Sequence, residues 1–262
     1  MADIEGAAAT VFVVGAGGDR IIHGMSERDV IAVDCAGIKD FAALRRCLSE
    51  DGRWGTRIAL PDGSVTRIAG LDYRTLGAER FRFGMAPVCF LRGTLIETAT
   101  GARRIETLTP GDMIRTFDRG WQPLRHVSRS THDFGPGPQA MKPVRLKPHA
   151  LARGVPEREL LVSPGHRIGL PATAPRVLLA ARKLRHLAGV SDRANCRLAR
   201  YFNLLMERHE LVRANGAWAE TLLVTDATIR AAGLPEALQG LARQMVRPLA
   251  ANAAEAARGV EA

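Results

Sequence analysis

The chain has 262 residues, 46% of them hydrophobic, so it can bury a sizeable core in one or two domains and is too apolar to be disordered. Its four cysteines are irregularly spaced and include no CxxC pair, which argues against a disulfide scaffold and a cysteine-rich zinc site. No stretch approaches the roughly 18 consecutive apolar residues of a membrane-spanning helix. The acidic start lacks the positive charge of a secretory signal, so we expect a cytoplasmic protein or one exported without a cleaved N-terminal signal.

The net charge of +10 is concentrated in the second part of the chain. Residues 1–88 contain 11 Lys and Arg against 12 Asp and Glu, whereas residues 89–262 contain 26 against 15. This step in charge predicts a domain boundary near residue 89. The positive residues are mostly scattered arginines without a nucleic-acid-binding motif, so we predict an ordinary basic surface and no specific nucleic-acid partner.

The pattern of residues 1–84 predicts a small β-rich module with one helix. Asp40 is placed to cap a short helix that carries Phe41, Leu44 and Leu48 on one face and ends near Gly52. Apolar or alternating runs predict the strands of the module, at residues 11–14, 29–33, 57–60, 64–68 and 81–83.

A glycine-rich run, residues 15–20, follows the first predicted strand. It has Arg20 where the third glycine of a dinucleotide-binding fingerprint would stand, so we predict no nucleotide site there. The run is also a fragment of a calcium-binding β-roll repeat, and one partial copy cannot complete a calcium site. The order of patterns over residues 10–83 weakly resembles segments that follow calcium β-rolls in secreted bacterial proteins. The role of the module and calcium binding both stay open.

A short linker, residues 85–88, leads into a region of short strands and turns. The spacing of its turn signals is typical of an all-β domain, which we place at residues 89–221. The pattern then becomes helical and predicts a tail over residues 222–262, with three leucines on one face: Leu234, Leu238 and Leu241. The predicted fold class is therefore mainly β, a β-rich module followed by an all-β domain with a helical tail.

Cys89 begins this second region, and a serine and two distant histidines accompany it. Ser163 and His166 form a Ser-x-x-His block, and His209 follows further on, ahead of Asn215-Gly216. A cysteine with distant histidines and a hydroxyl is a candidate nucleophile with its base and oxyanion donor. Each residue alone also has a structural explanation, because cysteine is often buried and a histidine can be pinned beside a turn. Zinc binding by the cysteine and the two histidines is an alternative, but with only three ligands we predict neither a metal nor a cofactor.

The order of these residues resembles the Hint domain of hedgehog proteins and inteins. Three further motifs precede the Ser-x-x-His block in the family's order: Cys89-Phe90, Gly93-Thr94 and Thr109-Pro110-Gly111-Asp112. The resemblance covers residues 89–221 and implies a horseshoe-like all-β fold.

The resemblance also implies that the chain cleaves itself. Cys89 would attack the carbonyl of Val88 in an N-to-S acyl shift that leaves a thioester. His166 would protonate the departing Cys89 nitrogen, Ser163 would serve the oxyanion or position the bond, and His209 would act in the last block of the site. The substrate would be the chain's own N-terminal segment. The nucleophile that resolves the thioester stays open: water, a thiol, an amine or an alcohol.

The chain departs from the family pattern at two places. Glu220 and Thr221 stand where inteins end in His-Asn, and threonine cannot cyclise to a succinimide, so we predict cleavage without standard splicing. Phe202 and Asn203 stand where the family often has an assisting aspartate. The alternative function is a catalytically silent Hint-fold scaffold, or interaction module, whose N-terminal segment does the binding.

Overall fold

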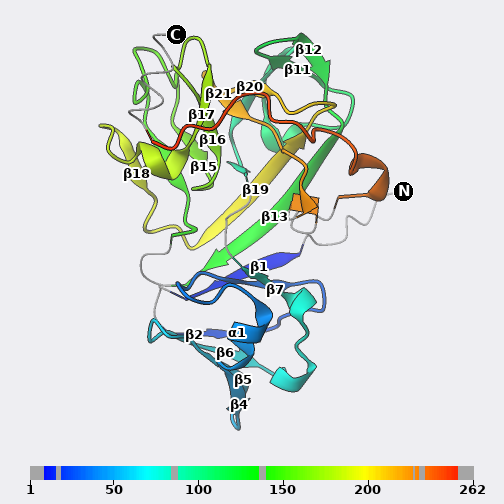
Figure 1. Ribbon diagram of the computed structural model, residues 1–262, viewed down its shortest axis with the longest axis vertical. Helices are drawn as coiled ribbons and strands as arrows, with labels where there is room; N and C mark the ends of the chain where they lie inside the picture. The colour runs from blue at the N-terminus through cyan, green and yellow to red at the C-terminus, as the bar shows by residue number, and fades with distance from the viewer. Residues whose placement is uncertain are drawn as a thin grey trace. The chain divides into compact units, whose positions relative to one another are not determined.

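The computed structural model describes residues 9–15, 19–83, 88–135, 140–226, 228–229 and 234–252 (Figure 1). It is mainly β, as predicted. The chain divides into two compact units, and the division does not follow the order of the sequence. Unit 1 comprises Met1–Met85, Ser130–Lys142 and Ala194–Arg200, and unit 2 comprises Ala86–Arg129, Pro143–Arg193 and Tyr201–Ala262. Most of the predicted linker and the middle of the glycine-rich run lie outside the described residues.

Unit 1 contains a parallel arrangement in which β1 (Thr10–Val14) is the central strand. On one side β1 pairs with β3 (Val30–Val33), which pairs in turn with β7 (Phe81–Phe83). On its other side β1 pairs with the last residues of β13 (His126–Phe134), so that Val11 lies opposite His132. Continuous apolar runs such as Val-Phe-Val-Val suit strands that are covered on both faces.

A second sheet of unit 1 has the order β2-β6-β5-β4, with bounds Arg20–Ile22, Val65–Ala69, Gly55–Ala59 and Leu48–Asp51.

Helix α1 (Phe41–Arg45) begins where Asp40 accepts a hydrogen bond from the Ala43 N–H at 2.7 Å. The prediction that this helix continues to Leu48 and ends near Gly52 is wrong. Leu48 instead starts β4, where it is buried opposite Ile58 of β5, because antiparallel pairing satisfies the backbone there. Two 3₁₀ helices, Tyr73–Thr75 and Ala78–Arg80, precede β7.

In unit 2, one set of antiparallel strands has the order β18-β14-β15-β8-β19. Their bounds are Val190–Asp192, Val144–Leu146, Leu160–Val162, Phe90–Leu91 and Leu198–Leu205, the first residues of β19 belonging to unit 1. The two-residue strand β8 is thus held between β15 and β19, where Phe90 pairs with Val162 on one side and Phe202 on the other.

A second sheet of unit 2 has the order β10-β9-β11-β20-β21-β16-β17, and β12 also pairs with β11. The bounds of these strands are Gly101–Arg104, Leu95–Thr98, Met113–Thr116, Leu211–Ala214, Ala217–Glu220, Arg167–Leu170, Val177–Ala180 and, for β12, Gly120–Pro123. Two 3₁₀ helices, Ile105–Thr107 and Ala181–Leu184, interrupt the strands. One hydrophobic cluster draws residues from both sets of strands, including Phe90, Val162, Ile96 and Ile168.

Asn215-Gly216 makes the turn between β20 and β21. Both residues have positive φ, 46° and 86°, which a two-residue type I′ hairpin requires and which asparagine and glycine adopt most readily. The Asn215 side chain also accepts the Leu95 N–H at 2.7 Å and donates to the Glu159 carbonyl at 2.6 Å. This pair therefore fixes the hairpin to its neighbours.

The predicted helical tail is not clearly present. In the described part of residues 222–252, the helical pieces are a turn that includes Asp226, Thr228 and Ile229 and the 3₁₀ helix Glu236–Leu238. Pro235 and Gly240 interrupt a regular helix here. The three leucines of the predicted face still lie together, in a cluster with Leu205, Leu222 and Val224. Among the described residues, every helix is too short or too polar to cross a lipid bilayer.

Candidate active site

Strand pairing brings Cys89 and Ser163 together although 73 residues separate them in the chain. Cys89 immediately precedes β8 and Ser163 immediately follows β15, and these strands are antiparallel neighbours. The Cys89 N–H donates to Ser163 Oγ at 2.9 Å, and the Ser163 N–H donates to the Cys89 carbonyl, also at 2.9 Å. Both residues are fully buried. The nitrogen of the Val88–Cys89 peptide bond is therefore held by a serine hydroxyl in a dry environment.

The Cys89 thiol is buried, and burial raises its pKa well above the usual range. A hydrogen bond from the side chain of Asn203 acts in the opposite direction. Asn203 lies in β19, next to the residue that pairs with Phe90, and its amide also donates to Ser128 Oγ at 3.2 Å. An amide nitrogen has two protons, so one can serve each partner. The sequence marked Asn203 only as a departure from the family, whereas the structure brings it to the sulfur.

His166 lies in the turn after Ser163 and is also fully buried. Its N–H donates to the Ser163 carbonyl at 3.0 Å, and its ring packs against Phe90 with centroids 4.2 Å apart. Burial lowers the pKa of His166 to about 4, although the charge of Glu220 and the backbone of Cys89 partly oppose this effect. Within the described chain, neither ring nitrogen makes a hydrogen bond of normal geometry. His166 is therefore a neutral imidazole at neutral pH, beside the Cys89 backbone.

His209 contacts Glu220 and lies at the far end of a buried charge network. Its Nε2 is 3.1 Å from Glu220 Oε2, and its Nδ1 accepts the Val246 N–H at 3.0 Å. Because Nδ1 accepts a hydrogen bond, a ring proton lies on Nε2, which donates to the carboxylate. Arg167 completes the network, because its backbone N–H and its guanidinium bind the two Glu220 oxygens at 2.8 and 2.9 Å. Glu220 thus occupies the position between the two histidines.

The structure therefore places the predicted site residues in two groups. Ser163 and His166 lie at the backbone of Cys89. His209 does not join this group directly: it binds Glu220, whose charge acts on His166. Both His209 ring nitrogens are engaged, and the described residues contain no cluster of metal-ligating side chains. Glu220 and Asn203 are not among the predicted site residues, although the sequence identifies both positions as departures from the family pattern.

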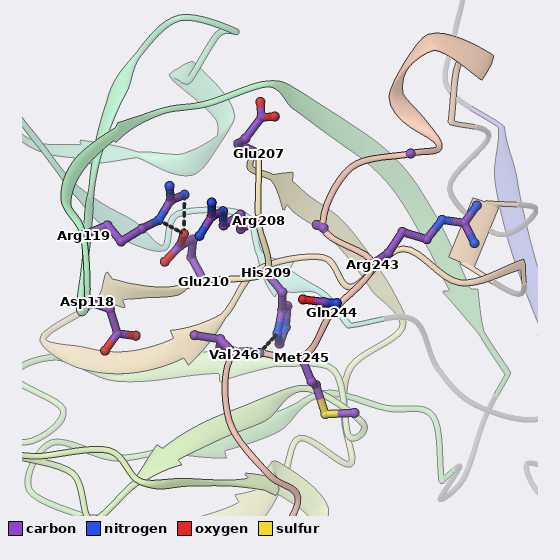
Figure 2. Close-up of a pocket in the computed structure, with 12 residues that line it drawn as sticks. Asp118, Arg119, Glu207, Arg208, His209, Glu210, Arg243, Gln244, Met245 and Val246 are labelled. Carbon is purple, nitrogen blue, oxygen red and sulfur yellow. Dashed lines mark hydrogen bonds and ion pairs between the residues drawn. The ribbon is translucent and has the colours of Figure 1, made fainter.

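The segment after Thr221 closes over His209. Figure 2 shows the Val246 backbone joined to the His209 ring, beside the residues that line a cleft. The cleft has a volume of about 650 Å³. The cleft is lined by Asp118, Arg119, residues 207–210, Gly240 and residues 242–246. The His209 side chain is fully buried, so the cleft does not expose its ring. The cleft therefore gives no open path to Cys89 through His209.

Thr221 is buried at the end of β21 and is fixed by the neighbouring chain. Its N–H donates to the Glu210 carbonyl and its hydroxyl accepts the Glu210 N–H, both at 2.9 Å. Glu210 in turn pairs with Arg119. The backbone of the next residue is also fixed, because the Leu222 N–H donates to the Leu204 carbonyl at 2.8 Å.

A protein-family model described as the Hint domain matches residues 88–226, more than half of the chain. The chain therefore belongs to the Hint domain family.

No curated protein matches the chain. Three solved structures illustrate what it is similar to. The bacterial intein-like domain from Clostridium thermocellum has 13% identity and a TM-score of 0.37, over 52% of this chain and 100% of that one. The gp41-1 intein has 14% identity and a TM-score of 0.33, over 50% and 96%. A DnaB intein from Synechocystis has 12% identity and a TM-score of 0.33, over 52% and 99%.

Proposed function

We propose that this protein is a single-turnover autoprotease that cleaves its own Val88–Cys89 bond through a thioester. The observation that carries the proposal is the hydrogen bond of 2.9 Å from the Cys89 N–H to Ser163 Oγ, with the neutral imidazole of His166 beside the same residue. These contacts support a scheme in which Cys89 is the nucleophile, Ser163 fixes the scissile nitrogen and His166 accepts a proton.

Proton movement begins at the thiol. Because burial keeps the Cys89 thiol protonated, attack requires a base, and a neutral His166 can accept the Sγ proton. The Asn203 amide stabilises the developing thiolate by a hydrogen bond. The sulfur then bonds to the Val88 carbonyl carbon and forms a tetrahedral intermediate. In this scheme His166 acts first as a base, a step that precedes its predicted role as an acid.

Collapse of the intermediate breaks the bond between the Val88 carbonyl carbon and the Cys89 nitrogen. The imidazolium of His166 returns its proton to that nitrogen, which leaves as a free amine, and Ser163 Oγ keeps the nitrogen in place. The product is a thioester between Val88 and the Cys89 sulfur. A thioester is less stable than an amide, so the reaction proceeds only if a second nucleophile attacks the thioester and consumes it. Water, a thiol, an amine or an alcohol would each leave a Val88 acyl product and restore the thiol.

The network of His209, Glu220 and Arg167 supports His166 electrostatically. The Glu220 carboxylate favours the imidazolium that forms when His166 accepts the thiol proton. Arg167 and His209 hold this carboxylate in position through direct hydrogen bonds. His209 is therefore a positioning residue in this scheme, acting through Glu220.

Intact mass after incubation with a small thiol tests the proposal. We expect one fragment that ends at Val88 and one that begins at Cys89, because the thiol intercepts the thioester. Cys89→Ala should abolish cleavage, while Cys196→Ala is the matched control and should cleave normally. His166→Ala should slow cleavage by about 10²–10⁴-fold. Ser163→Ala should have a smaller effect, up to about 10²–10³-fold if its hydroxyl serves the oxyanion in addition to holding the nitrogen. Cleavage of the Cys89→Ala variant at the same bond would show that a contaminating protease is responsible.

A catalytically silent scaffold is the second candidate function, and the complete burial of Cys89 and His166 is the observation that favours it. In that case the Hint fold carries the N-terminal module, and residues 1–84 do the binding. An intact mass that persists for days in concentrated thiol would favour the scaffold over the autoprotease.

A further inference from the structure

Unit 1 contains segments that precede the Val88–Cys89 bond in the sequence and segments that follow it. It combines the N-terminal segment Met1–Met85 with two later segments, Ser130–Lys142 and Ala194–Arg200. The later segments lie after Cys89, so they would belong to the C-terminal fragment of a cleaved protein. Whether a cut separates the two fragments therefore depends on the contacts inside unit 1.

Backbone pairing is the first of these contacts. Strand β1 pairs in parallel with β13 at four consecutive positions, from Thr10 opposite Thr131 to Val13 opposite Phe134. On its other edge β1 pairs with β3. The N-terminal fragment would therefore lose a neighbour of its central strand on separation, and the β1 backbone groups on that side would lose their partners.

The Arg20 side chain binds both β1 and β13 and is only 11% exposed. Its Nη1 donates to the Val13 carbonyl at 3.2 Å and to the Asp133 carbonyl at 3.3 Å, and its Nη2 pairs with Asp133 Oδ1 at 3.0 Å. Charge-assisted hydrogen bonds of this kind are among the stronger polar contacts in proteins. Arg20, which belongs to β2 of the N-terminal fragment, thus binds both β1 of that fragment and β13 of the later segment.

A third contact joins the N-terminal segment to the end of the first later segment. The Met141 N–H donates to Asp34 Oδ2 at 3.3 Å. The two later segments also bind each other, because the Phe134 N–H donates to the Arg197 carbonyl at 2.8 Å and the buried Lys142 Nζ to the Ala194 carbonyl at 2.7 Å. The later segments therefore act together as one partner for the N-terminal segment.

We infer that cutting the chain between residues 83 and 89 does not release its N-terminal part, which stays bound to Ser130–Lys142 and Ala194–Arg200 as one half of a two-chain protein. For the natural cut this inference rests on the proposed self-cleavage, whereas the contacts that hold the fragments do not. A nucleophile that resolves the thioester would consequently become attached to Val88 of an assembled protein. Release of the N-terminal fragment would require the strand pairing and side-chain contacts within unit 1 to break.

The test uses a full-length chain in which Cys89→Ala blocks self-cleavage and a site-specific protease sequence replaces residues 84–87. After digestion, a denaturing gel establishes that the chain is cut, and native mass spectrometry measures what stays together. We expect a 1:1 complex with the summed mass of the two fragments, which dissociates only when urea unfolds unit 1. Separate fragments in native buffer would overturn the inference. Because the added protease makes the cut, failure of the proposed function leaves this result unaffected.

Two arginine variants of the same cut protein test the contact. Arg20→Ala should make the fragments dissociate about ten- to a hundred-fold faster, because it removes charge-assisted hydrogen bonds between β1 and β13. Arg74→Ala is the matched control, since Arg74 is exposed and its ion pairs with Glu50 and Asp72 stay within the N-terminal segment. Equal dissociation rates for the two variants would contradict the assigned role of Arg20.

Discussion

At the scale of single residues, the reactivity of Cys89 depends on two opposed influences. Burial favours the neutral thiol, and the Asn203 side chain favours the thiolate. The nearby His166 is neutral for the same reason that the thiol is protonated, because a low dielectric disfavours both charged forms. Transfer of the proton from the Cys89 thiol to His166 therefore creates an ion pair of thiolate and imidazolium. The neighbouring polar groups determine the free-energy cost of forming this pair.

Asn203→Leu tests the contribution of the amide. The substitution keeps a similar volume but removes the hydrogen bond to the sulfur, so we expect thiol-dependent cleavage to slow by about ten- to a hundred-fold. Ser128→Ala is the control, since it removes only the other partner of the same amide and should have a smaller effect. Time courses of intact mass at fixed thiol concentration provide the rates. An unchanged rate in Asn203→Leu would contradict the role of the amide.

Val88→Gly tests access to the scissile carbonyl. Val88 is β-branched and buried, so its γ-methyl groups crowd the carbon that the sulfur and then the resolving nucleophile must reach. Glycine should raise the rate of thiol-dependent cleavage, and Val88→Ala should give an intermediate rate. The three proteins are compared side by side by mass spectrometry. If all three cleave at one rate, access to this carbonyl does not limit the reaction.

At the scale of elements, the site depends on a short strand held between two longer ones. β8 has only two residues, yet its pairing with β15 brings Cys89 opposite Ser163. The segment after β21 closes the opposite side of the site, where Val246 binds His209 and the Arg247 guanidinium donates to the Pro175 carbonyl at 3.0 Å. The contact between Val246 and His209 uses a backbone N–H, which a proline substitution can test.

Val246→Pro removes the N–H that binds His209 Nδ1. The buried ring nitrogen would then lack its donor, and we expect a loss of about 1–3 kcal/mol in the free energy of unfolding together with slower cleavage. Val246→Ala keeps the N–H and is the matched control for the lost side chain. Urea denaturation and cleavage rates measure both effects. A proline variant as stable and as active as the alanine variant would exclude this contact from the site.

The C-terminal segment should remain attached after the N-terminal cut. Thr221 cannot form a succinimide, and its backbone and hydroxyl are bound to Glu210. We therefore expect the C-terminal fragment to have the mass of residues 89–262. A peptide that begins at Leu222, detected in the same samples, would contradict this expectation.

At the scale of the whole molecule, two buried histidines couple stability to pH. Burial lowers the pKa of His132 and of His166 to about 4, from 6.5 for an ordinary histidine. Between these values the unfolded chain binds more protons than the folded one, so stability rises with pH. The stabilisation is complete above pH 6.5 and is lost as the pH falls toward 4. Each histidine contributes on the order of 2–4 kcal/mol across this window.

The slope of stability against pH therefore provides a whole-molecule test. We expect the free energy of unfolding in urea to fall between pH 7 and pH 4.5, and His166→Gln should make this fall smaller. His186→Gln is the control, because His186 is exposed. Equal slopes in the two variants would mean that His166 is not buried in its neutral form.

The sequence by itself determined the type of fold and the candidate bond. The alternation and spacing of its apolar residues predict a mainly β protein, and Cys89, Ser163 and His166 appear in the family's order. It also identified Glu220 and Thr221 as departures from the splicing pattern. The mainly β fold class is confirmed because it depends on residue types at short range, such as the asparagine and glycine that a tight hairpin requires. The cleaved bond and the absence of splicing stay predictions.

Only the tertiary structure decided which distant segments become neighbours. The pairing of Thr10–Val13 with residues 131–134, the hydrogen bond of Asn203 to Cys89, and the contact of Val246 with His209 carry no local signal. The helical pattern after Thr221 misled for the same reason, because its leucines are buried against Leu205 and Leu222 without a regular helix. Apolar periodicity specifies which face of a segment is buried, but the partner that buries it is chosen by packing and backbone pairing across the whole chain.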